Sequence, residues 1–273
     1  MVSTATILTC TASLLIALVL PVAVLAIFAA KNKNLGIVTA WLLGAAGFFV
    51  TQILIRLPIL TVLQMQPWFM EFSQSHLFAF AFGLAFTAGL FELAGRFAVA
   101  KLMRRNLTWQ RSLAAGLGHG GIEAMLLTGM TYVNNLLYIA MINTGGFDAI
   151  LAQTAAMGVD VSALEQIRDQ LISASPALFL LGGFERILAM TAHCAMSMLV
   201  CWGVAQKKAA KPVLLCLVIH TCIDLTAGLN MVLPQNIAYP VIYGILTLVA
   251  IGSVCILRKI RRIWKEDNHA AQE

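Results

Sequence analysis

The sequence predicts an all-α fold, a polytopic membrane protein with about seven transmembrane helices in one bundle. Three observations lead to this prediction. Hydrophobic residues make up 60% of the 273-residue chain, whereas charged residues make up only 11%. Apolar runs recur along the chain, and each approaches or exceeds the ~20 residues that a helix needs to cross a bilayer. Basic residues gather in short groups at the ends of these runs, which is the topology signal of membrane proteins.

The apolar runs follow one another from one end of the chain to the other. They lie at roughly 4–30, 35–58, 77–100, 112–142, 175–205, 212–233 and 238–257. No polar stretch between them is long enough to build a soluble domain. We therefore expect residues 1–273 to form a single integral-membrane domain.

The basic clusters also predict the orientation of the helices. They lie at 31–33, 101–111, 207–211 and 258–265. With seven spans, all four clusters fall on one side of the membrane if the N-terminus is outside and the C-terminus is cytoplasmic. Residues 258–273 are then a basic cytoplasmic tail. The net charge of +6 follows from these clusters, so we expect no nucleic-acid partner.

The polar segment 143–174 falls on the outer side in this topology. Its acidic residues outnumber its single basic residue, Arg168. Val161, Leu164, Ile167 and Leu171 recur at helical spacing. This spacing predicts a short amphipathic helix on the outer membrane surface.

Ionisable side chains inside the apolar runs are the strongest functional signal, because they are costly at membrane depth unless they face a cavity or a partner. His119 and Glu123 lie one helical turn apart, on one face. Glycines surround the pair at 116, 118, 120 and 121. These glycines are compatible with close helix packing and equally with open space for a substrate or water. By itself, the pair fits packing as well as function.

Further ionisable residues lie in three other runs. His220 and Asp224 repeat the same spacing, and a carboxylate there would fix the tautomer of the imidazole. Glu92 and Arg96 are expected to form an intrahelical ion pair. Counting from the basic clusters places Glu92, His119 and His220 about 12–13 Å deep, and His193 about 21 Å deep. A convergent polar site is therefore possible. The role of Glu185, beside Arg186, is ambiguous.

Several segments together resemble the YhfC-like family of bacterial intramembrane proteases. They are Gly118-His-Gly-Gly-Ile-Glu123, Phe184-Glu-Arg-Ile-Leu-Ala-Met-Thr-Ala-His193, His220-Thr-Cys-Ile-Asp224 and Phe91-Glu-Leu-Ala-Gly-Arg96. That family is distantly related to the CAAX-protease and bacteriocin-processing membrane enzymes. The resemblance implies a multi-pass protein of the bacterial cytoplasmic membrane.

In those relatives a Glu-Glu-x-x-x-Arg motif supplies the water-activating glutamate, and motifs Phe-x-x-x-His and His-x-x-x-Asn or Asp follow. Glu92 and Arg96 match the second glutamate and the arginine. His193 matches the middle motif, with Ala189 in the phenylalanine position, and the last motif is matched by His220 and Asp224. Phe91 replaces the first glutamate, so Glu123 on the neighbouring helix is the expected substitute.

We therefore expect an intramembrane endopeptidase that acts on a membrane-embedded or membrane-anchored peptide. Glu123 would take a proton from water. The imidazoles of His119, His193 and His220 would either bind zinc or, in a metal-free glutamic-type enzyme, donate hydrogen bonds to the oxyanion. Asp224 would orient His220. Glu92 with Arg96 would hold the third helix in register, and Glu185 is an additional catalytic candidate.

Two other classes of function remain compatible with these residues. Buried His, Glu and Asp side chains are also the groups of proton relays, so a proton-coupled transporter or channel is the main alternative. Haem ligation by His193 and His220 is another. The first would show substrate flux in liposomes without cleavage, and the second a Soret absorption band.

Overall fold

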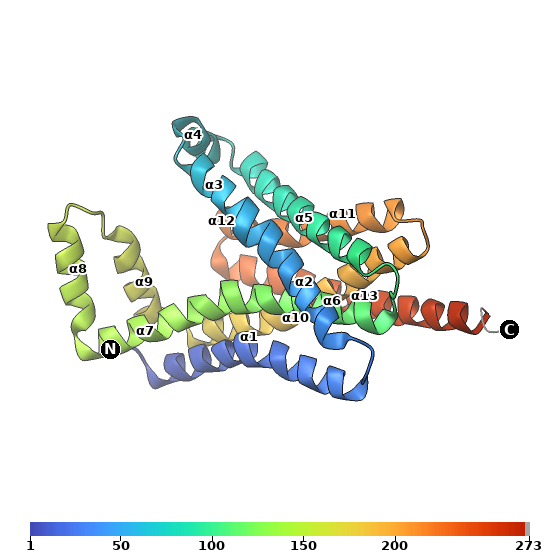
Figure 1. The fold of residues 1–273 in the computed structure, drawn as a ribbon. Helices are drawn as coiled ribbons and strands as arrows, with labels where there is room; N and C mark the ends of the chain where they lie inside the picture. Colours follow the sequence, from blue (N-terminus) through green and yellow to red (C-terminus); the bar gives the residue numbers. More distant parts are fainter. Residues whose placement is uncertain (271–273) are drawn as a thin grey trace. The chain divides into compact units, whose positions relative to one another are not determined.

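The computed structural model describes residues 1–270, except for the side chains of Met231 and residues 267–270. Every regular element in that range is a helix, and no strand occurs there (Figure 1). In chain order the elements are α1 (Thr4–Lys31), α2 (Ile37–Phe48), η1 (Phe49–Arg56), α3 (Leu57–Gln64), α4 (Pro67–Ser75), α5 (Leu77–Leu102), α6 (Trp109–Glu123), η2 (Ala124–Gly129), α7 (Met130–Thr144), α8 (Gly146–Ala156), α9 (Ser162–Ser173), α10 (Pro176–Ala205), α11 (Ala210–Ala227), α12 (Leu229–Val232) and α13 (Gln235–Ala270).

Seven helical stretches of the described chain are long and apolar enough to cross a membrane. They are Thr4–Lys31, Ile37–Gln64, Leu77–Leu102, Trp109–Thr144, Pro176–Ala205, Ala210–Ala227 and Gln235–Glu266. The all-α fold and the number of spans predicted from the sequence are thus confirmed, and the chain is a multi-pass membrane protein. The orientation of the termini stays a prediction. The basic tail is a helical continuation of α13 as far as Ala270, and its last residues, 271–273, lie outside the described range.

Two of these spans contain a π-helical segment. In the second span, α2 passes through η1 into α3, and the backbone N–H of Leu57 bonds to the carbonyl of Gln52, five residues earlier. Pro58 follows directly and has no N–H to donate, which favours such a local widening of the helix. In the fourth span, η2 begins immediately after Glu123. Segments of this kind are frequent at functional sites.

Contacts between residues divide the chain into two compact units. Unit 1 contains residues 1–22 and 124–187, and unit 2 contains residues 23–123 and 188–273. The boundaries fall inside α1, between α6 and η2, and inside α10.

Unit 1 has a small core of its own. Its buried apolar residues are Val2, Cys10, Tyr132, Ile139, Leu171 and Phe179. The backbone carbonyl of Phe179 accepts hydrogen bonds from both Ser13 Oγ and Tyr132 Oη.

The segment 143–174 of unit 1 contains two helices, α8 and α9, where the sequence predicted one. Helix α9 has the predicted amphipathic pattern, because Leu171 is buried and Leu164 and Ile167 are half-buried, with exposed polar residues between them. Before α9, Ser162 donates to the carboxylate of Asp160 from both its backbone N–H and its hydroxyl, and these bonds hold the pKa of Asp160 below its usual range.

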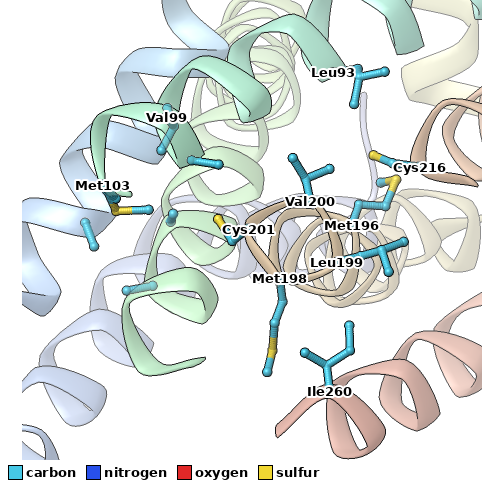
Figure 2. Packing of buried hydrophobic residues seen from close by; sticks show 14 of the residues in the cluster. Leu93, Val99, Met103, Met196, Met198, Leu199, Val200, Cys201, Cys216 and Ile260 are labelled. Atoms are coloured by element: carbon cyan, nitrogen blue, oxygen red, sulfur yellow. The ribbon is translucent and has the colours of Figure 1, made fainter. Parts of the chain in front are cut away.

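The core of unit 2 is built around α10. Ten consecutive residues of this helix, 192–201, are buried, so it is enclosed on every side at this level. Figure 2 shows Met196, Leu199 and Val200 of α10 among side chains from neighbouring helices. These neighbours include Leu93 and Val99 of α5, Cys216 of α11 and Ile260 of α13. A helix that is apolar all round belongs at the centre of a bundle, and α10 is also the helix that carries His193.

Helices α2 and α6 approach each other closely through small residues. A Cβ atom added at Gly44 would lie 1.9 Å from the carbonyl oxygen of Ala115, and one added at Gly118 would lie 1.9 Å from that of Trp41. Only glycine fits where two backbones come this near. The glycine-rich stretch around His119 therefore serves helix packing, which was one of its two possible uses.

Candidate metal centre

Four helices of unit 2 bring their ionisable side chains to one place inside the bundle. The residues are Glu92 and Arg96 of α5, His119 and Glu123 of α6, His193 of α10, and His220 and Asp224 of α11. Glu92, Arg96 and the three histidines are buried. At membrane depth such a group of charges and imidazoles is a functional site by default.

Glu92 lies at the centre of this cluster. Its Oε2 atom is 2.9 Å from His119 Nε2, 3.5 Å from His220 Nδ1 and 3.7 Å from His193 Nδ1. Three imidazole nitrogens thus face one carboxylate oxygen. The other oxygen, Oε1, accepts a hydrogen bond of 2.9 Å from Gln52 Nε2, so the carboxylate is held from both sides.

Two of the three imidazoles have a second carboxylate on their far side. His193 Nε2 lies 2.9 Å from Glu123 Oε2, and His220 Nε2 lies 3.2 Å from Asp224 Oδ2. An ionised carboxylate only accepts hydrogen bonds, so these contacts favour the proton on Nε2 of both rings, with an unprotonated Nδ1 facing the cluster. Pairs of this kind orient histidines that ligate metals.

Arg96 contributes the positive charge nearest to Glu92. Its Nη2 donates to Glu92 Oε2 at 3.0 Å and to His193 Nδ1 at 2.5 Å. The predicted intrahelical ion pair is therefore present, one turn along α5. Arg96 is also connected to α10, which the sequence did not indicate.

Gln52 and Arg56 are site residues that sequence reasoning missed. Both lie on the π-helical segment η1, and Arg56 Nη1 donates to Gln52 Oε1 at 3.3 Å. Arg56 Nη2 also donates to the carbonyl of Leu84 in α5, at 2.7 Å. The available signal was an amide and a guanidinium four residues apart within an apolar run, since such residues are costly there without partners.

Small residues allow the helices to come close enough for this geometry. A Cβ atom added at Gly120 would lie 2.9 Å from the Cβ of His193, and one added at Gly116 would lie 2.6 Å from the Cα of Cys194. Helices α6 and α10 therefore pack backbone against backbone beside the two histidines. As a result, the rings of His119 and His193 stack with centroids 5.4 Å apart.

The residues of the cluster fit a divalent metal ion. Donor atoms of Glu92, His119 and His193 all lie within 4.8 Å of one another. Imidazole nitrogens and carboxylate oxygens are both common zinc ligands. The three imidazole nitrogens lie 2.9–3.7 Å from Glu92 Oε2, so they converge on one point next to that carboxylate.

Two further observations agree with a cation at this point. His220 Nδ1 is buried and has no hydrogen-bond partner, although buried polar atoms normally have one. The cluster also contains more negative than positive charge. Its three carboxylates, those of Glu92, Glu123 and Asp224, outnumber the guanidiniums of Arg96 and of Arg56 at its edge. A divalent cation would offset that excess.

Comparison with known proteins gives a consistent result. A family model described as YhfC intramembrane metalloprotease matches residues 16–247, which is most of the chain. The chain belongs to the YhfC family. The Bacillus subtilis (strain 168) protein named uncharacterized membrane protein YhfC is 33% identical to it over 195 residues, which cover 71% of this chain and 73% of that relative. No solved structure matches. At the level of the family, the match supports a membrane protease.

Within this YhfC family member, the structure places the two glutamates differently from the arrangement expected from the sequence. Glu92, expected to support the third helix, faces all three imidazoles. Glu123, expected to be the base, lies across the His193 ring from that centre. Asp224 contacts His220 as expected. Glu185 belongs to unit 1, where its carboxylate pairs with Arg186, and a catalytic role for it stays a prediction.

Proposed function

We propose that this chain is a metal-dependent intramembrane endopeptidase, which hydrolyses a peptide bond of a membrane-embedded or membrane-anchored substrate. The observation that carries the proposal is the convergence of three imidazole nitrogens on the Glu92 carboxylate, with outer carboxylates on two of the three rings. A zinc ion bound there would act as a Lewis acid on water and on the scissile carbonyl. Membership of the YhfC family supports the same class of enzyme.

In this proposal Glu92 is the proton acceptor. Its Oε2 atom is the only carboxylate oxygen that faces all three imidazoles among the described residues. A general base must lie within hydrogen-bond reach of the water whose proton it takes. Gln52 holds the opposite oxygen, so Oε2 stays directed toward the centre while it exchanges a proton.

The three histidines would hold the metal, and the outer carboxylates would orient two of them. Glu123 and Asp224 keep the protons of His193 and His220 on Nε2, so that both Nδ1 atoms point a lone pair at the centre. Glu123 contacts the opposite nitrogen of the His193 ring from Glu92, so it is less well placed to act on a water beside Glu92 Oε2. This placement is the reason for assigning the base to Glu92.

The experiment is metal analysis combined with a cleavage assay on the full-length chain in lipid nanodiscs. We expect about one zinc ion per chain and cleavage of a transmembrane reporter peptide that stops with a chelator and resumes when zinc is restored. His193→Ala should lose both metal and cleavage. His76→Ala is the matched control, since His76 is exposed and lies at the end of α4, outside the cluster. An active preparation without metal would contradict the metal-dependent reaction and support a glutamic-type enzyme.

A further inference from the structure

Arg96 and a metal ion would compete for the same atoms of the candidate metal centre. Nη2 of Arg96 donates to the Nδ1 lone pair of His193 at 2.5 Å and to Glu92 Oε2 at 3.0 Å. An unprotonated imidazole nitrogen has a single lone pair, and an arginine cannot lose its proton in a protein. His193 Nδ1 can therefore bind the guanidinium or a metal ion, but not both at once.

The structure also contains a place to which the guanidinium can move. A small cavity lies beside Arg96, with room for about one water molecule. Its walls include Arg96, His119, Ser197 and Cys201. Arg96 Nε, Arg96 Nη1 and Ser197 Oγ are all buried and make no hydrogen bond. Because Ser197 follows His193 by one helical turn, its hydroxyl lies on the same face of α10.

We propose that Arg96 is an exchangeable internal cation of this site. In one state the guanidinium occupies the lone pairs of Glu92 and His193. In the other state a metal ion takes the Nδ1 lone pair of His193, and the guanidinium shifts toward the cavity and donates to Ser197 Oγ. This inference rests on the proposed function, because it needs a metal at the cluster.

The exchange explains why a permanent positive charge lies among metal-binding groups. A buried carboxylate without a partner is strongly destabilising, so Glu92 needs a cation whether or not metal is bound. A guanidinium that stayed in hydrogen-bond contact with Glu92 and His193 would repel a metal ion at close range in a region of low dielectric. Withdrawal into the cavity reduces this repulsion, and it satisfies donors that now have no partner.

The test is the apparent affinity for zinc, measured with a competing chromophoric chelator on the full-length chain in nanodiscs. The apparent affinity of a ligand falls in proportion to the fraction of protein molecules that are in the binding-competent state. If Arg96 engages the lone pairs in most molecules, Arg96→Met should bind zinc at least ~10-fold more tightly than the wild type. A fixed guanidinium would also repel zinc, so this variant tests whether Arg96 opposes the metal, and the serine variants below test whether the guanidinium moves.

A pair of serine variants keeps the test decisive if Arg96→Met fails to fold. Ser197→Ala removes the acceptor of the withdrawn guanidinium, so zinc should bind about 10-fold more weakly. The matched control is Ser112→Ala, since Ser112 is an equally buried serine whose hydroxyl donates to the carbonyl of Thr108, and its zinc affinity should equal that of the wild type.

Two results would overturn the exchange while leaving the proposed function intact. One is unchanged or weaker zinc binding by folded Arg96→Met, and the other is equal affinity of the Ser197→Ala and Ser112→Ala variants, each alongside normal zinc binding by the wild type. A wild-type chain that takes up no zinc would instead overturn the metal centre itself, and the exchange with it.

Discussion

Replacing Glu123 by glutamine separates the two carboxylates that compete for the role of base. Glu123 Oε2 lies 2.9 Å from His193 Nε2, and its side chain is only 13% exposed. Glutamine keeps an acceptor oxygen but loses the charge that stabilises the proton on Nε2. Removing an outer partner of a metal-ligating histidine typically costs 10–100-fold in metal affinity, which is about 1.4–2.8 kcal/mol.

The size of the expected loss of zinc affinity depends on how deeply each outer carboxylate is buried. A charge-assisted contact is stronger when water is excluded, so Glu123→Gln should lie near the upper end of that range. Asp224→Asn should lie near the lower end, because the Asp224 contact with His220 is longer, at 3.2 Å, and its side chain is 33% exposed.

The assay is cleavage of a transmembrane reporter peptide as free zinc is raised. For Glu123→Gln the activity curve should shift to higher zinc and approach the wild-type plateau. Glu71→Gln, an exposed carboxylate in α4, should not shift. A plateau that stays about 10²–10⁴-fold below the wild type at saturating zinc would show that Glu123 is the base, and the role assigned here to Glu92 would be wrong.

The remaining predictions concern the base, the packing and the topology. Glu92→Gln should reduce cleavage about 10²–10⁴-fold without recovery at high zinc, and near-normal turnover would contradict its role. Gly118→Val should leave little folded protein in a detergent thermal-stability assay, since its Cβ would lie 1.9 Å from a backbone carbonyl of α2. Gly244→Ala should be neutral or slightly stabilising, because nothing lies within 4 Å of the added Cβ. A cysteine introduced within 207–211 should react only with reagents that reach the cytoplasm, whereas labelling from outside would reverse the predicted orientation.

Much of the local geometry of the site could be predicted from spacing along the chain. Glu92 and Arg96, and likewise His220 and Asp224, lie four residues apart, and the structure places each pair in contact. Helical geometry is local, so an i, i+4 spacing determines which side chains share a face. The pairing of Glu123 with His193, between two helices, had no such signal in the sequence.

The π-helical segments were also outside what spacing could predict, because counting at 3.6 residues per turn assumes a regular helix. Gln52 and Arg56 lie on η1, and both contact α5. Their position in an apolar run marked them as polar residues in need of partners, but the partner helix had no signal in the sequence.

By itself, the sequence determined the seven spans and the presence of buried ionisable groups. Length and apolarity decide which segments cross a bilayer, and these are properties of each segment alone. Only the tertiary structure decided that Glu92, and not Glu123, faces the three imidazoles. The physical reason is that the rotation and separation of α5, α6, α10 and α11 depend on where small residues on different helices meet, as Gly116 and Gly120 meet α10, and this is a property of pairs of helices.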